Sequence, residues 1–136
     1  MTKVVVNKCY GGFGLSDAGM RAYAKAKGIT LYPEDGQFGM VTYFTVPVNE
    51  RLGEIDFYNA SMPERKAYNQ RYRQERLYDG DLERDDPILI DVVERLGDAA
   101  NGRYARLEVT EVPDDVDWEI GEYDGQEWVQ EKHKTW

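Results

Sequence analysis

A two-residue turn near the C-terminal end constrains the fold of this 136-residue chain more than any other feature. Asp124 and Gly125 interrupt an alternating segment over residues 117–133. An Asp-Gly pair between alternating apolar and polar residues favours the type I′ turn of a β-hairpin. Because this turn fixes the pairing of the two strands, it places Ile120 opposite Val129.

The same register predicts that Glu122 lies opposite Glu127. Two like charges in directly opposite positions are unfavourable. This part of the hairpin therefore needs a cation, a metal ion or basic side chains beside it. The order of the acids does not match an EF-hand loop, so we assign no metal-binding residue.

Three further segments predict helices. Ser16 is placed to cap a helix over residues 17–27 that stops at Gly28. A basic helix covers 61–78, where Ser61 and Glu64 have capping-box spacing. The clearest helix spans 85–102, where Asp86 caps and Pro87 occupies the first turn. Its apolar stripe has the spacing of one helix face and consists of Leu89, Val92, Val93 and Leu96.

Short β-branched or alternating segments predict the strands, namely 2–10, 29–32, 39–48 and 103–112 beside the hairpin. Residues 33–36 read as a turn. Together these elements predict a single compact α+β domain over 1–136, with a mixed or antiparallel sheet and two or three helices. We divide it into a β-α unit (1–32), a middle segment (33–78) and a helix-strand-hairpin segment (79–136).

A glycine-rich corner connects the first strand to the first helix. Backbone N–H groups in such a corner, next to a helix N-terminus, can hold an anion such as a phosphate or a nucleotide. The glycine spacing matches neither a dinucleotide fingerprint nor a P-loop, and the alternative is a tight corner that only packs two elements. The candidate ligand residues are Lys8, Gly11, Gly12, Phe13, Gly14, Ser16 and Arg21.

The charge of the chain is unevenly distributed. The net charge is −9, residues 1–78 carry eleven Lys/Arg against eight Asp/Glu, and residues 108–136 carry two against ten. Direct binding of nucleic acid by the acidic end is therefore disfavoured, and a basic protein partner is favoured. The candidate partner-binding residues are Trp118, Glu119, Glu122, Asp124, Glu127 and Trp128. The alternatives are that the acids only solvate the surface and that the tryptophans, including Trp136, belong to the core.

The basic helix leaves three alternatives open. Its residues 65–76 are rich in Arg, Lys and Tyr and could contact a nucleic acid. They could equally neutralise the acidic hairpin of the same chain. A third alternative is the hairpin of a second subunit in a homodimer.

Catalytic motifs are not evident in the sequence. Cys9 is the single cysteine and His133 the single histidine, so a catalytic triad, a zinc site and an intramolecular disulfide are not expected. Cys9 reads as a small buried hydrophobic residue, and we assign no catalytic residue and no cofactor. A metal-dependent nucleotide hydrolase is supported only by the abundance of carboxylates. The chain lacks a signal peptide and a membrane-spanning apolar run, which fits a cytoplasmic protein.

Two segments of the chain resemble segments of a known group of proteins. "NKCYGGFGLS" at residues 7–16 and "EYDGQEWVQEKHKTW" at residues 122–136 are similar to segments of a group of small proteins of tailed phages and prophages. The resemblance covers residues 1–32 and 79–136. It implies a cytoplasmic accessory protein that binds and inhibits a host or defence component or, alternatively, sequesters a nucleotide signal. It implies no catalytic residue.

Overall fold

The computed structural model describes residues 1–51, 53, 56 and 58–132. In it the chain forms two compact units. Both ends of the chain build the first unit, Met1–Lys27 with Asp79–Trp136, and the middle builds the second, Gly28–Tyr78. Among the described residues, three α-helices and six strands in two-stranded antiparallel sheets confirm the predicted α+β class. The extent of a single domain over 1–136 stays a prediction.

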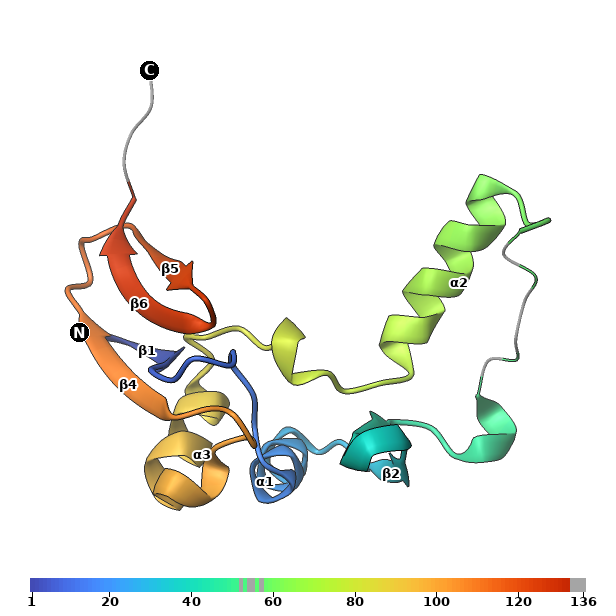
Figure 1. Ribbon diagram of the computed structural model, residues 1–136, viewed down its shortest axis with the longest axis horizontal. Helices are drawn as coiled ribbons and strands as arrows, with labels where there is room; N and C mark the ends of the chain where they lie inside the picture. The colour runs from blue at the N-terminus through green and yellow to red at the C-terminus, as the bar shows by residue number, and fades with distance from the viewer. Residues whose placement is uncertain (52, 54–55, 57, 133–136) are drawn as a thin grey trace. The chain divides into compact units, whose positions relative to one another are not determined.

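The centre of the first unit is a pair of antiparallel strands from opposite ends of the sequence. β1 (Thr2–Asn7) pairs with β4 (Leu107–Val112), with Thr2 opposite Val112 and Asn7 opposite Leu107. The β-branched residues 4–6 of β1 are fully buried, as expected for a strand covered on both faces. Figure 1 shows the two strands side by side between a helical layer and a hairpin.

Two helices form the layer on one face of this strand pair. α1 (Asp17–Lys27) packs against α3 (Pro87–Leu96), and α3 contacts both β1 and β4. The predicted caps are confirmed, because Ser16 Oγ accepts the N–H of Gly19 at 3.0 Å and Asp86 accepts the N–H of Ile88 at 2.9 Å. Of the predicted apolar stripe, Leu89, Val92 and Val93 are buried and Leu96 is half-buried.

The end of α3 differs from the prediction. The α-helix stops at Leu96 because Gly97 adopts a positive φ of 56°, and a 3₁₀ turn, η4 (Gly97–Ala100), follows before Asn101. Glycine reaches this conformation without the penalty that a side chain would impose. The helix predicted over 85–102 therefore extends six residues too far at its C-terminal end.

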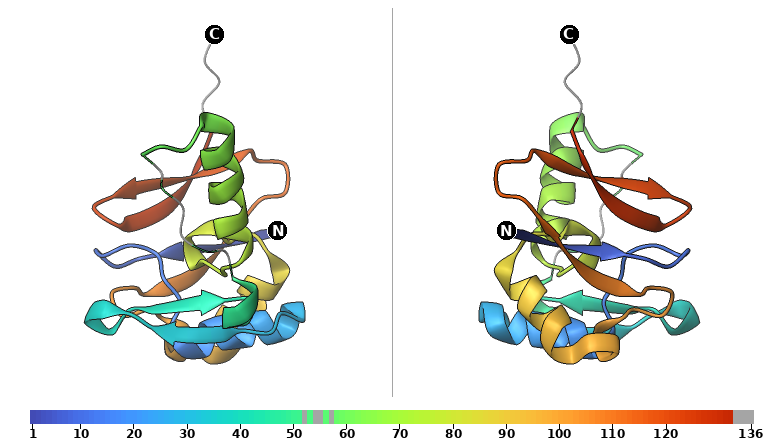
Figure 2. Two further views of the ribbon diagram at one scale, coloured as in Figure 1. Left: turned by 90° about the vertical axis from the view of Figure 1, so that its right-hand side faces the viewer. Right: turned by 90° about the vertical axis from the view of Figure 1, so that its left-hand side faces the viewer.

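The C-terminal hairpin covers the other face. β5 (Trp118–Tyr123) and β6 (Gln126–Glu131) pair with Ile120 opposite Val129, which confirms the predicted register. Asp124 and Gly125 have φ values of 52° and 90°, as a type I′ turn requires. The inward-facing hairpin residues Trp118, Ile120 and Val129, with Val116, pack on the buried cluster of Val4, Val6 and Val112. Figure 2 shows hairpin, strand pair and helices as successive layers.

The second unit contains a short exposed sheet whose first strand differs from the prediction. β2 (Tyr32–Asp35) pairs with β3 (Val41–Phe44) around the 3₁₀ turn η1 (Gln37–Gly39). The sequence placed this strand at 29–32 and a turn at Pro33, but Pro33 lies within β2 opposite Tyr43. A proline fits because β2 is an edge strand, where a missing N–H breaks no ladder. The strand expected over 39–48 is limited to β3 and is followed by η2 (Val48–Glu50).

The helix of the second unit has no buried face. α2 (Met62–Gln74) begins after Ser61, whose Oγ accepts the N–H of Glu64 at 3.3 Å as predicted. It ends at Gln74 rather than at residue 78, because residues 76 and 77 pair with β3. None of its thirteen residues is buried. The 3₁₀ turn η3 (Asp79–Asp81) then begins the second part of the first unit.

Candidate functional site

A fully buried asparagine joins three segments of the first unit. Asn7 at the end of β1 is 0% exposed. Its Oδ1 accepts the N–H groups of Cys9 (3.2 Å) and Arg106 (2.9 Å), and its Nδ2 donates to the carbonyls of Cys9 (2.7 Å) and Gly125 (2.8 Å). The amide thus makes four hydrogen bonds, the full number that its two ends support. It connects the glycine corner, the segment before β4 and the turn of the hairpin.

Next to Asn7 lies a two-point ion pair. Arg84 Nη1 and Nη2 donate to the two carboxylate oxygens of Glu127 at 2.6 and 2.9 Å. Glu127 Oε1 also accepts the N–H of Asn7 at 2.8 Å, and the carbonyl of Arg84 accepts the N–H of Val5 at 2.8 Å. The Arg84 guanidinium lies 3.7 Å from the ring centre of Phe13, a cation–π contact. These contacts connect the hairpin and Arg84 to the edge of β1 that does not pair with β4.

The prediction that Glu127 presents a charge to a partner is wrong. Glu122 does lie opposite Glu127 as expected, but Glu127 is 7% exposed and paired with Arg84. Of the three alternatives for this like-charged pair, the structure therefore supports a basic side chain. Glu122 itself is exposed, and its Oε1 accepts the N–H of Gly125 at 3.2 Å.

The glycine corner is packed by the protein's own groups. A Cβ added to Gly125 would collide with the backbone nitrogen of Gly12 and lie 2.6 Å from that of Gly11, so the hairpin turn rests directly on these amides. The N–H of Leu15 donates to Asp79 Oδ2 at 3.0 Å, and the carbonyl of Gly14 accepts a backbone N–H at 2.9 Å. A carboxylate of the chain thus occupies an amide that an anionic ligand would use.

The polar residues predicted beside the corner also have roles within the chain. Ser16 Oγ caps α1 and donates to the carbonyl of Ala99 at 2.5 Å. Arg21 forms an ion pair with Asp17 at 2.8 Å on the exposed side of α1. Lys8 is half-buried, and its backbone N–H donates to the carbonyl of Arg106 at 2.8 Å. These contacts favour the tight corner over the anion cradle. Ligand binding at the corner stays a prediction.

The outer face of the hairpin carries an ordered row of side chains, defined here as the outer hairpin face: Glu119, Gly121, Tyr123, Trp128 and Gln130. The Trp128 ring covers Gly121, its cross-strand partner. Trp128 Nε1 donates to Gln130 Oε1 at 2.7 Å, and Gln130 Nε2 donates to Glu119 Oε1 at 2.9 Å. Trp128 is 39% and Tyr123 71% exposed. Two aromatic rings are therefore presented to solvent, and the first is held in place by hydrogen bonds.

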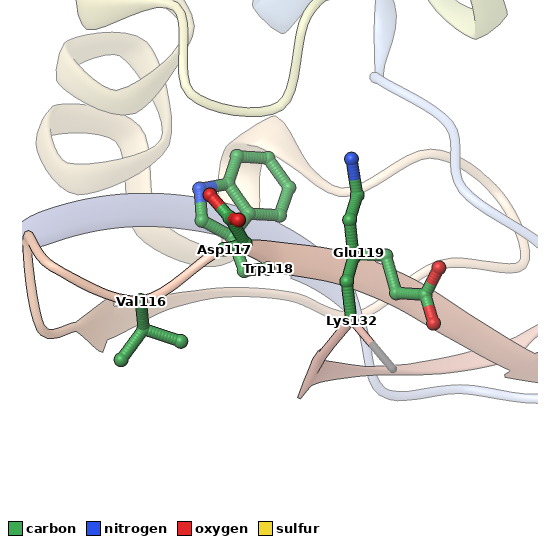
Figure 3. Close-up of a pocket in the computed structure, with 5 residues that line it drawn as sticks. All are labelled: Val116, Asp117, Trp118, Glu119 and Lys132. Carbon is green, nitrogen blue, oxygen red and sulfur yellow. The ribbon is translucent and has the colours of Figure 1, made fainter. Parts of the chain in front are cut away.

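A shallow pocket lies where the two hairpin strands end (Figure 3). Its volume is about 480 Å³ and it is lined by Val116, Asp117, Trp118, Glu119 and Lys132. The indole ring and the two carboxylates attract positive charge, and because the pocket holds one cation of its own, Lys132, its acids exceed its cations by one. The predicted residues Trp118 and Glu119 thus meet in one pocket, although Trp118 also packs on the core.

A second cluster of charged groups joins the two helices. Asp86 Oδ2 accepts the hydroxyl of Tyr23 at 2.6 Å and lies 3.1 Å from Lys27 Nζ. Burial alone would raise the pKa of the Asp86 carboxyl, but hydrogen bonds from Tyr23, the backbone of Ile88 and Lys27 outweigh burial and hold that pKa below its ordinary value. Burial and the bond to Asp86 raise the pKa of Tyr23. This cluster stabilises the helix pair.

The described residues that could take part in catalysis or metal binding lie apart from one another. Within the described part of the chain, no three His, Cys, Asp or Glu residues converge to hold a metal ion. Cys9 is half-buried rather than buried, and its thiol is free. His133 and Trp136 lie outside the described residues. No helix among the described residues combines the length and apolarity that crossing a bilayer requires.

Comparison with family models, curated proteins and solved structures gives no match to this chain. The function is therefore inferred from the chemistry of its own surface.

Three polar residues that assemble the first unit were not predicted from the sequence: Asn7, Asp79 and Arg84. Arg84 is the single cation in the acidic segment 79–86, and Asn7 is a polar residue at the end of an apolar strand. Both exceptions to the local pattern are signals of a buried polar contact. Their partners could not be named, because Glu127 lies 43 residues from Arg84 and 120 from Asn7.

Proposed function

We propose that this chain is a non-enzymatic binding protein that holds a host or defence protein on its outer hairpin face and thereby inhibits it. The observation that carries this proposal is the exposed pair of aromatic rings, Trp128 and Tyr123, on a face that the chain's own core does not cover. The cytoplasmic setting and the relation to phage accessory proteins are part of the same proposal and come from the sequence resemblance.

The chemistry of the face supports a protein partner. Tryptophan and tyrosine are enriched among the few residues that carry most of the binding energy in protein interfaces, since they bury a large area and lose little conformational entropy. Trp128 is already held by Gln130 and by its packing on Gly121, so binding costs it little further order. The outer hairpin face is therefore prepared for contact before a partner arrives.

The charge of the first unit supports a basic partner surface. Its two segments carry eleven Lys/Arg and nineteen Asp/Glu, a net charge of −8. Glu122 and Asp124 are exposed at the turn end of the hairpin, and Glu119 is half-buried in the pocket at the other end. Such a surface attracts a basic protein over long range and repels phosphate backbones.

Site-specific photo-crosslinking in living bacteria tests the proposal. A photo-reactive amino acid replaces Tyr123 in the full chain, and the matched control places it at the exposed Lys25 on α1. We expect one adduct of defined mass at position 123, absent at position 25, and lost when Trp128→Ala is added. The same set of adducts at both positions, or an adduct indifferent to Trp128→Ala, would refute the proposal.

A further inference from the structure

A cationic stripe runs along one face of α2. Met62, Lys66, Asn69 and Arg73 follow the i, i+4, i+7, i+11 spacing and fall within an arc of about 60°. All four are exposed. Among the described residues, neither Lys66 nor Arg73 has a carboxylate within ion-pair distance, whereas Arg71 on the opposite side pairs with Glu75.

Both α2 and the hairpin have a face with no packing partner among the described residues of their own unit. Helices in proteins are stabilised mainly by tertiary packing, yet no residue of α2 is buried. The outer hairpin face likewise leaves Trp128 and Tyr123 in solvent. Helix and strands also match in length, since thirteen helical residues span about 20 Å and six strand residues also span about 20 Å.

The order of chemical groups along the two surfaces is complementary. The stripe begins with the apolar Met62 and continues with its two cations. The hairpin carries Tyr123 and Trp128 toward its turn, and at its open end the pocket holds Asp117 and Glu119 with the single cation Lys132, so that negative charge exceeds positive charge there. When Met62 lies on the aromatic rings, the cations lie toward the carboxylates. Opposite charges and apolar groups therefore meet in one orientation, which is what a specific contact requires.

We propose that α2 of one copy of this chain packs on the outer hairpin face of a second copy. This inference rests on the proposed function, because both take the outer hairpin face as a binding surface. The group bound there is α2 of a second copy. Each copy carries both surfaces, so two reciprocal contacts close a twofold dimer. A basic partner protein would then compete with α2 for the same face.

A charge-exchange experiment in analytical ultracentrifugation tests this dimer. One variant reverses the stripe (Lys66→Glu with Arg73→Glu), and the other reverses the pocket (Asp117→Lys with Glu119→Lys). The matched control, Lys25→Glu with Arg103→Glu, makes the same charge change as the first variant at exposed positions elsewhere. We expect wild type and control to dimerise, each test variant to dimerise at least 30-fold more weakly, and an equimolar mixture of the two variants to recover the wild-type affinity.

The mixture is decisive, because only contact between different chains can be restored by mixing. A monomeric wild type at all concentrations, or variants whose mixture remains monomeric, would overturn the inference. A contact of α2 with the hairpin of its own chain would give the first of these results. Circular dichroism checks that each variant folds. A stripe variant that does not fold is replaced by Lys66→Gln with Arg73→Gln, and a pocket variant that does not fold by Asp117→Asn with Glu119→Gln, each expected to weaken the dimer less than the charge reversal.

The two proposals fail in different ways. A crosslink from position 123 to another protein without a dimer in the centrifuge would overturn the inference alone. If mixing the two variants restores the dimer as expected, but position 123 forms adducts only with a second copy of this chain, the proposed function alone would be overturned.

Discussion

Arg84 and Glu127 hold each other through two hydrogen bonds of 2.6 and 2.9 Å, and this pair joins the segment before α3 to the last strand. Glu127 accepts the N–H of Asn7 and Arg84 stacks on Phe13, so the pair also reaches β1 and the glycine corner. An acid that the sequence suggests for partner binding thus belongs to the interior of the first unit.

Replacing Glu127 by Ala should lower the free energy of unfolding by about 3 kcal/mol, because Arg84 would remain largely buried without its counter-charge. The control Glu122→Gln changes an exposed acid and should alter it by less than about 0.5 kcal/mol. Urea denaturation of both variants measures the difference. Equal effects would show that the Arg84 pair adds nothing to stability.

Replacing Gly125 by Ala should lower the free energy of unfolding by more than about 3 kcal/mol, since the new Cβ meets the backbone of the glycine corner and overpacking adds to backbone strain. At Gly12 no atom lies within 4 Å of an added Cβ, and only its positive φ of 92° opposes Ala, at about 1–2 kcal/mol. Thermal denaturation compares the two. The reverse order would contradict the packing of the hairpin turn on the corner.

Asp86→Asn should remove a contribution to the free energy of unfolding that requires the Asp86 carboxylate to be charged. The folded state lowers the pKa of Asp86, so its contribution is present above the unfolded value near pH 4 and disappears as the pH falls through the folded value. Asn still accepts the capping hydrogen bond, so the variant isolates the charge. We expect it to be less stable than wild type by about 1–2 kcal/mol at pH 7. Denaturation from pH 2 to 7 should show this difference shrinking below pH 4, and a difference independent of pH would contradict it.

The two described tryptophans of the hairpin should behave in opposite ways. Trp118→Ala should destabilise the fold by about 3 kcal/mol or more, because Trp118 packs on the buried valines. Trp128→Ala should cost less than about 1.5 kcal/mol of stability, since the ring is 39% exposed, but should weaken partner binding by 30-fold or more. Calorimetry and the crosslinking yield at position 123 measure the two effects. A Trp128→Ala variant that unfolds like Trp118→Ala would place Trp128 in the core.

Elements with local determinants could be predicted from the sequence. The Asp124–Gly125 turn set the hairpin register, and Ser16, Ser61 and Asp86 marked helix starts, because each depends on neighbours within four residues. The pairing of Ile120 with Val129 follows from the turn alone. Errors arose where a local pattern had two solutions, as at Pro33, which suits a turn or an edge strand.

The candidate site was predicted in part. Trp118, Glu119 and Trp128 lie at the pocket or on the outer hairpin face, as the acidic, aromatic pattern suggested. Glu127 was assigned to the same surface, since its partner Arg84 is far away in sequence. The glycine corner was left with two alternatives, because Gly125 and Asp79 reach it only in the folded chain.

The sequence by itself determined the α+β class, the hairpin register, the helix starts and the acidic character of the C-terminal segment. These properties depend on short-range backbone preferences and on charge counts, which follow directly from a single sequence. The tertiary structure decided which acid is buried, what occupies the glycine corner and which aromatic ring remains exposed. Such choices depend on contacts between residues that are distant in sequence, since burial and pairing of charge exist only after the segments have packed.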